Sequence, residues 1–513
     1  MINYAEFLKK KNREIEDNYL KNLEKITQIR NETRGLEDKF LKFIFMIADR
    51  ILMMSEFEKE YSESYYKEKT LDELKAFNQT VFSEVLPENY EKSYANPEFS
   101  VGIFGNELGT IFSTFYIQFR GFLSYSIKHH RYLMEPWNKS FLEFYELIKK
   151  GISDKDSFQK VTTKAYKKLT VENQVMRFLE NYSYEASGFR SLVMTADFSD
   201  FRYLYQYGKY ISENETKTAE FFLNYPEEKI QKLAEAMVKA FIRGFELARK
   251  DVSQKETVNV YYNIGQEKLV RVLVNELADK NLKALLNTVS STTINRQYNY
   301  DHRFIGALFV DEDFIAKSIN IIEQAAEKCG DELLKFAGPF YFDKFGEKPF
   351  DPKQKDACLK LSSEQQKLIQ KMNIERSKII DKYISRSKTS FCIIGFPVPE
   401  IGEKFEDIFE ETLAINMVDT IHHEEIQQHI VDVLDLADYV HVKGKSGNLT
   451  DIKVKMQKLE NPDKHTNFVN CGADVNIPVG EVFTSPQLKG TNGVLHLKET
   501  FLKKLKFTDL KLT

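Results

Sequence analysis

The feature that most constrains the fold is a change in hydrophobic pattern near residue 254. Before that point, apolar residues recur at intervals of three, four and seven, as in the stripe from Tyr4 to Ile26 on an otherwise charged segment. This spacing is typical of amphipathic helices, and strand-like alternation is scarce in the same part of the chain. The pattern predicts an all-helical region over residues 1–253, with helices expected after the first one at 37–61, 112–133, 139–150, 172–181 and 227–249.

The segment that follows residue 254 has the pattern of a βαβ unit. Residues 257–262 alternate as a strand does, Gly265 breaks the alternation, residues 266–279 return to helical spacing, and residues 282–289 are again strand-like. Two strands joined through a helix lie parallel, so we expect an α/β domain with a parallel sheet. Gly265 stands alone, without the further glycines that cradle a dinucleotide, and the unit is therefore expected to be a scaffold.

The same alternation of strand and helix continues to residue 438, which sets the predicted α/β domain at 254–438. Its further expected elements are strands at 304–310 and 390–396 and helices at 312–336, 363–384 and 421–434. From Tyr439 onward the pattern is that of β-structure. Residues 440–442 and 449–456 flank a glycine-containing turn and predict a hairpin, and 494–497 and 505–512 predict further strands.

The predicted fold class is therefore α+β with several domains. A helical N-terminal region is followed by an α/β domain with a parallel sheet and then by the start of a β-rich domain over residues 439–513. The strand-like pattern continues up to Thr513 without a turn or polar tail, so we expect the natural chain to continue past it.

Composition excludes several classes of partner. The 513 residues suffice for about three domains. A formal net charge of −4 provides no positive field for nucleic acid or anionic lipid. The four cysteines show no CxxC spacing, which disfavours a disulfide framework and a cysteine-based zinc site. The N-terminus lacks the apolar core of a signal peptide, and charges interrupt the most apolar stretch, 40–54. We expect a cytoplasmic protein that binds neither nucleic acid nor membranes.

One histidine-rich helix invites comparison with a zinc site. The segment His422-His-Glu-Glu-Ile-Gln-Gln-His429 resembles HExxH, in which two imidazoles lie one turn apart on a helix. The residue four positions after His423 is Gln427, so the motif is incomplete. An exposed helix face is the favoured interpretation, with metal binding as the alternative.

An aromatic stretch over residues 198–210 interleaves six rings with the cations Arg202 and Lys209. Such interleaving can stack single-stranded bases. Because the chain is acidic overall, helix packing or a surface that contacts peptides is the favoured interpretation.

The most informative segment is Asn476-Ile-Pro-Val-Gly-Glu-Val-Phe-Thr-Ser-Pro486. Pro478 and Gly480 favour a tight turn that presents Glu481 at the mouth of a strand, with Val482 and Phe483 as apolar anchors. A carboxylate held on a rigid turn is a suitable ligand for a divalent cation. From the residues alone, a role for Glu481 as a turn or cap carboxylate is favoured over a metal-binding role.

This segment closely resembles a signature of the thermophilic metallo-aminopeptidases. Two upstream segments, 395–399 and 440–451, and the short hairpin around Gly493 are also similar to that family. The resemblance spans about the second half of the chain and is specific from Val440 onward. The helical first half does not resemble the family and is interpreted as an extension.

The resemblance implies a function and a metal site. Members of the family are cytoplasmic homodimers that use two divalent metal ions, such as zinc, cobalt or manganese, to remove N-terminal residues from peptides. It implies that Glu481 is a metal ligand, and it assigns a catalytic role to no residue of this chain. The family's other ligands lie downstream of the signature. We therefore expect the intact protein to be an aminopeptidase and this chain alone to be inactive or nearly so.

Two other hypotheses stay open. The chain could be a non-catalytic scaffold or peptide-binding protein that keeps the α/β core of the family. Alternatively, the helical first half could be an interaction module of its own. The sequence does not identify the native metal or the preferred N-terminal residue.

Overall fold

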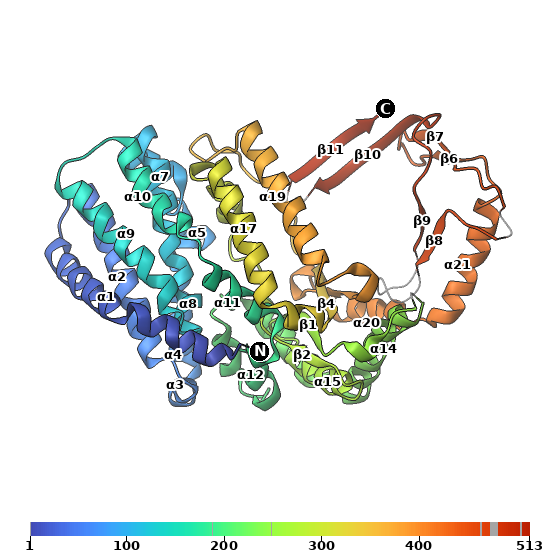
Figure 1. Ribbon diagram of the computed structural model, residues 1–513, viewed down its shortest axis with the longest axis horizontal. Coiled ribbons are helices and arrows are strands. Elements are labelled where there is room, and N and C mark those ends of the chain that lie inside the picture. The colour runs from blue at the N-terminus through green and yellow to red at the C-terminus, as the bar shows by residue number, and fades with distance from the viewer. Residues whose placement is uncertain (1, 187, 248, 462–463, 472–480, 503–504) are drawn as a thin grey trace.

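A computed structural model describes all residues of the chain except 1, 187, 248, 462–463, 472–480 and 503–504 (Figure 1). The helices of residues 4–167 lie at one end of the molecule, and the C-terminal strands lie toward the other. Among the described residues no strand precedes Thr257, which confirms the helical character predicted for the first half. The α-helices of this region are α1 (Tyr4–Thr33), α2 (Lys39–Glu60), α3 (Glu63–Glu68), α4 (Leu71–Phe82), α5 (Pro87–Tyr90), α6 (Pro97–Phe104), α7 (Asn106–Tyr116), α8 (Phe122–Ile127), α9 (Arg131–Lys149), α10 (Lys155–Lys167), α11 (Val171–Tyr182), α12 (Arg190–Thr195), α13 (Glu213–Asn224) and α14 (Glu227–Leu247).

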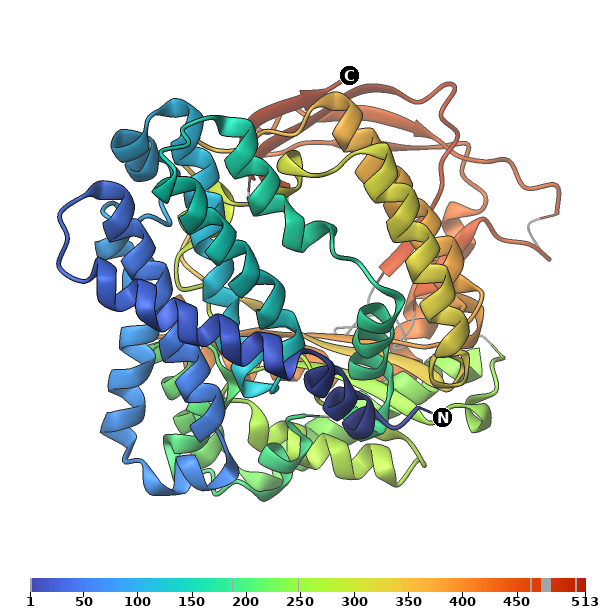
Figure 2. The ribbon, with the colours of Figure 1, turned by 60° about the vertical axis from the view of Figure 1, so that its left-hand side comes forward.

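An aromatic core holds the first ten helices together. Phe43, Phe112, Phe115, Phe144 and Phe158 are fully buried and come from α2, α7, α9 and α10. The rings of Phe115 and Phe144 stack with their centroids 4.2 Å apart. Figure 2 shows α1 running across this bundle, where it packs on α2 and α9. Burial of large rings dominates the stability of such a core.

The helix predicted over residues 112–133 is broken in the structure. α7 ends at Tyr116, a 3₁₀ segment covers Ile117–Gly121, and α8 ends at Ile127. His129 then adopts a positive φ of 53° before α9 begins at Arg131. The uninterrupted apolar pattern concealed this turn, because the broken segments bury residues on several sides. Pro136 lies inside α9.

The parallel sheet predicted from the βαβ pattern is confirmed. β1 (Thr257–Asn263) leads through α15 (Glu267–Ala278) to β2 (Lys283–Leu285), which pairs with β1 in parallel. The strand order is β2-β1-β4-β5, and β3 pairs with the end of β1. The other strands are β3 (Val289–Ser290), β4 (Phe336–Phe345) and β5 (Cys392–Pro397), and the other helices are α16 (Arg296–Asp301), α17 (Glu312–Lys328), α18 (Gly330–Leu334), α19 (Ser363–Asp381), α20 (Phe405–Asn416) and α21 (Thr420–Leu434).

Two sequence-based expectations for this part are wrong. The strand expected at 304–310 is a 3₁₀ segment, Ile305–Leu308. The helix expected to extend to residue 336 ends at Lys328, and the strand β4 begins at Phe336. β4 is an inner strand, between β1 and β5.

The core of the sheet extends into the helical region. Phe222 of α13 and Phe241 of α14 belong to the same buried cluster as Val258 of β1 and Phe340 of β4. The rings of Phe241 and Phe340 lie 4.7 Å apart. Helices before residue 253 thus cover the sheet, and the three-domain division stays a prediction.

The C-terminal part consists of two antiparallel sheets. The first has the order β11-β10-β7-β6 and contains the predicted hairpin β6 (Tyr439–Lys443) and β7 (Asp451–Lys455) with β10 (Asn492–Leu502) and β11 (Leu505–Leu512). The second pairs β8 (Phe468–Cys471) with β9 (Glu481–Thr484). A helical region, a parallel sheet and antiparallel sheets confirm the α+β class. No helix in the described part of the chain is long and apolar enough to cross a membrane.

Candidate functional site

Glu481 is the first residue of β9. It pairs with Cys471 at the end of β8, and its side chain is exposed. The preceding residues of the signature, including Asn476, Pro478 and Gly480, lie outside the described residues. The structure therefore places the candidate ligand at the mouth of a strand, and the predicted turn before it stays a prediction.

The two faces of the β8–β9 pair differ. Side chains of directly paired residues share a face, and neighbours along a strand alternate. Glu481 thus shares its face with Cys471, Val469 and Phe483, whereas Asn470 lies on the opposite face. Val469 is 46% exposed and Phe483 is 49% exposed, whereas Cys471 is buried, so the face that carries Glu481 is apolar and is open at Val469 and Phe483.

Other candidate ligands in this region are engaged elsewhere. His496 of β10 is buried, and its Nε2 lies 2.7 Å from Oδ1 of Asp509 while its Nδ1 accepts a hydrogen bond from the amide of Leu449. That imidazole holds the loop after β6 onto β10. In the described part of the chain, no group of three or more histidine, cysteine, aspartate and glutamate side chains could hold a metal ion. The described residues alone do not fit the dinuclear centre that the sequence resemblance implies.

The histidine-rich helix α21 has two different faces. His422 is exposed, with 68% of its side chain accessible, which agrees with the expected surface helix. His423 is partly buried and Gln427 is 5% exposed, so this edge of the helix is turned inward. Asn470 of β8 donates a hydrogen bond from Nδ2 to the main-chain oxygen of Glu424, at 2.9 Å.

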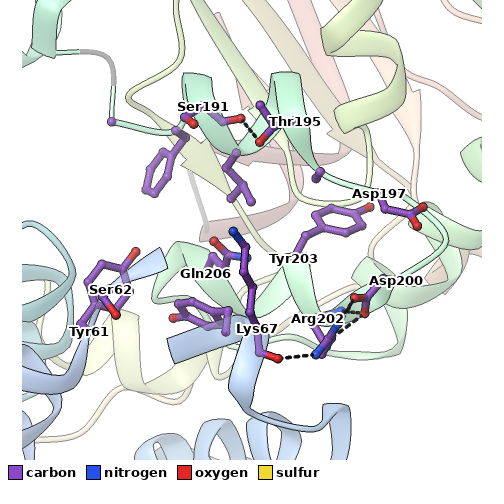
Figure 3. Close-up of a pocket in the computed structure, with 15 residues that line it drawn as sticks. Tyr61, Ser62, Lys67, Ser191, Thr195, Asp197, Asp200, Arg202, Tyr203 and Gln206 are labelled. Atoms are coloured by element: carbon purple, nitrogen blue, oxygen red, sulfur yellow. Dashed lines mark hydrogen bonds and ion pairs between the residues drawn. The ribbon is translucent and has the colours of Figure 1, made fainter. Parts of the chain in front are cut away.

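A cavity of about 350 Å³ lies in the helical region (Figure 3). It is bordered by the aromatic stretch of the sequence, and Tyr203 and Gln206 line it together with Lys67 of α3 and Thr195 of α12. Arg202 is held at its edge by Asp200, with the nearest nitrogen and oxygen 2.6 Å apart. Tyr203 and Tyr207 are buried, as the helix-packing interpretation predicts.

A buried carboxyl lies behind Tyr203. The Tyr203 hydroxyl donates to Oε2 of Glu267 at 3.4 Å, and the amide of Gly265 donates to the same oxygen at 2.8 Å. Glu267 is fully buried at the start of α15, and its burial raises the pKa of the carboxyl to about 7. Sequence reasoning had not singled out this group.

A segment in the second part of the chain matches a known protein family. Residues 350–504 match the family described as thermophilic metalloprotease, M29. This segment is therefore M29-like. It includes β5, the helices α19 to α21 and the strands β6 to β9 with Glu481. The predicted resemblance is confirmed, although the matched segment begins at residue 350 rather than near Thr257.

One solved structure that the chain is similar to is wild-type AmpT from Thermus thermophilus. The similarity covers 56% of this chain and 68% of that chain, at 17% sequence identity and a TM-score of 0.34. A TM-score at this level does not allow residues of one chain to be placed on the other. A search of curated proteins gave no match.

Proposed function

We propose that this protein is a metal-dependent aminopeptidase and that Glu481 is one of its metal ligands. The observation that carries the proposal is the M29 match over residues 350–504, which contains Glu481. The exposed carboxylate at the start of β9 is accessible to a metal ion. Substrates would be peptides with a free N-terminus, and the protein would act in the cytoplasm as a homodimer.

A complete site requires more than Glu481. Divalent ions at such a site, two in the form that the resemblance implies, polarise the scissile carbonyl and lower the pKa of the attacking water. A single carboxylate holds a hydrated cation only weakly, because each ion needs several protein ligands. The described residues bring no such set together. We therefore propose that turnover needs ligands beyond those that the described part of the chain supplies, and that zinc, cobalt or manganese occupies the complete site.

The experiment uses the protein as it occurs in its native cells. An antibody raised against the helical region captures it, and the eluate is assayed on dipeptides and on the same dipeptides with an acetylated N-terminus. We expect hydrolysis of the free peptides alone, loss of activity with a chelator, and recovery with zinc, cobalt or manganese.

Two results would count against this proposal. Native protein that hydrolyses no peptide with any of the three metals favours the scaffold or peptide-binding hypothesis. Hydrolysis that continues at the full rate in the presence of a chelator contradicts the part of the proposal that concerns metal ions.

A further inference from the structure

The interface between α21 and β8 contains buried polar atoms without hydrogen-bond partners. These atoms are Nδ1 of His423, Oε1 of Glu424, both amide atoms of Gln427 and Oδ1 of Asn470. We name these four residues the α21–β8 cluster. Buried polar groups in native proteins are nearly always hydrogen-bonded. Several unpaired polar atoms in one interface therefore indicate a binding site for an ion, a water molecule or a ligand.

Helix geometry brings three of the residues to one side of α21. Gln427 lies four positions after His423 and three after Glu424, so its side chain neighbours both of theirs along the helix. Asn470 is fixed beside them, because its Nδ2 donates to the main-chain oxygen of Glu424 at 2.9 Å and to Oε1 of Gln428 at 3.3 Å. That arrangement leaves the amide oxygen of Asn470 without a donor.

The unpaired atoms are mostly acceptors. A neutral imidazole nitrogen, a carboxylate oxygen and two amide oxygens form a mixed nitrogen and oxygen set, which suits a divalent transition-metal ion. Only two of the four residues are histidine or a carboxylate, and the amide oxygens of Gln427 and Asn470 complete the set. Arg243 of α14 holds the other carboxylate oxygen of Glu424 at 3.3 Å, which leaves Oε1 available. Because this guanidinium repels cations, binding should be weaker than in an all-carboxylate site.

We propose that the α21–β8 cluster binds one divalent transition-metal ion through His423, Glu424, Gln427 and Asn470. This site is distinct from that of Glu481, because Asn470 and Glu481 lie on opposite faces of the β8–β9 pair. The inference does not depend on the proposed peptidase activity. It gives the histidine-rich helix a role that its incomplete HExxH spacing had made improbable.

The test is a titration of the full chain with cobalt and with zinc, each added as the metal alone. Cobalt absorption in the visible range reports imidazole ligation, and equilibrium dialysis gives the affinity. We expect His423→Ala to weaken binding about tenfold or more. The matched control, His422→Ala, removes the exposed neighbouring imidazole and should leave this affinity unchanged. Glu481→Gln should also leave it unchanged.

A second variant covers the case in which His423→Ala fails to fold. Gln427→His places a second imidazole one turn after His423 and should tighten zinc binding. The proposal is overturned if the chain binds neither metal, in which case ordered water fills the cluster. It is also overturned if His422→Ala weakens binding as much as His423→Ala, or if Glu481→Gln alone abolishes binding. Loss of binding in Glu481→Gln alone would still support the proposed peptidase site.

Discussion

Nζ of Lys355 lies 2.9 Å from Oδ2 of Asp301, and both side chains are almost completely shielded from solvent. The same carboxylate oxygen accepts from the Tyr90 hydroxyl at 2.8 Å, and the same ammonium donates to Asn96 at 3.0 Å. Lys355 belongs to the start of the M29-like segment, whereas Tyr90 and Asn96 belong to the helical region. The buried pair thus anchors the matched segment on the helical half of the molecule.

Breaking this pair should destabilise the protein strongly. Lys355→Met leaves a buried carboxylate without its cation, and the free energy of unfolding should fall by about 3–5 kcal/mol. Urea unfolding monitored by circular dichroism measures the change. Lys360→Met is the matched control, because Lys360 pairs with Asp356 at 3.1 Å on an exposed surface. It should change stability by less than about 1 kcal/mol, and equal effects of the two substitutions would contradict the anchoring role.

Glu267 should make stability depend on pH. Burial raises the pKa of its carboxyl in the folded protein to about 7, above the ordinary value of 4.5 in the unfolded chain. The neutral form is therefore favoured by folding. The contribution of the neutral carboxyl to the free energy of unfolding is fully present below pH 4.5 and is lost as the pH rises through about 7. The total loss is about 3 kcal/mol.

The substitution Glu267→Gln tests this dependence. It should remove the decrease in the free energy of unfolding between pH 4.5 and pH 7. The variant should therefore be more stable than the parent protein at pH 8 and about equally stable at pH 4.5. Thermal unfolding across this range gives the comparison. Glu276→Gln, on the same helix, serves as control and should keep the parent profile. A parent-like profile for Glu267→Gln would show that the buried carboxyl does not titrate in this range.

Gly265 should tolerate no side chain. Its φ is +100°, and an added Cβ would lie 2.8 Å from the main-chain oxygen of Glu215. Gly265→Ala should therefore lower the free energy of unfolding by about 2–3 kcal/mol, through backbone strain and the contact with α13. Gly102 of α6 has open space around it. Gly102→Ala should raise stability by about 0.5–1 kcal/mol, and the opposite ranking in chemical denaturation would refute the argument.

The β1–α15–β2 unit could be predicted because its pattern is local. The spacing of apolar residues changes from a period of two to a helical period at Gly265 and returns to a strand-like pattern after α15. Each change is visible in a short window of sequence. β4 could not be predicted in this way. Its residues Gly338 and Pro339 are typical strand breakers, and its pairing with β1 contains a register irregularity opposite Thr257 and Val258.

The candidate site, too, could be predicted from the sequence only in part. Glu481 was singled out through the resemblance of its neighbours, and its position at the start of β9 agrees with the predicted strand mouth. The inward orientation of Gln427 and His423 was not predicted, because it results from the packing of β8 on α21. Asn470 and Glu424 are 46 residues apart in the sequence, and no local pattern joins them.

The most direct test of the central claim is the rate at which the native protein releases the N-terminal residue of a dipeptide, with and without Glu481→Gln. The substitution is made in the gene of the producing cells, and Glu499→Gln, which changes an exposed side chain of β10, is the matched control. We predict that Glu481→Gln lowers the metal-dependent rate about 100-fold or more, since the ligand set is broken, while Glu499→Gln retains it. An unchanged rate in Glu481→Gln would contradict the assignment of Glu481 as a metal ligand.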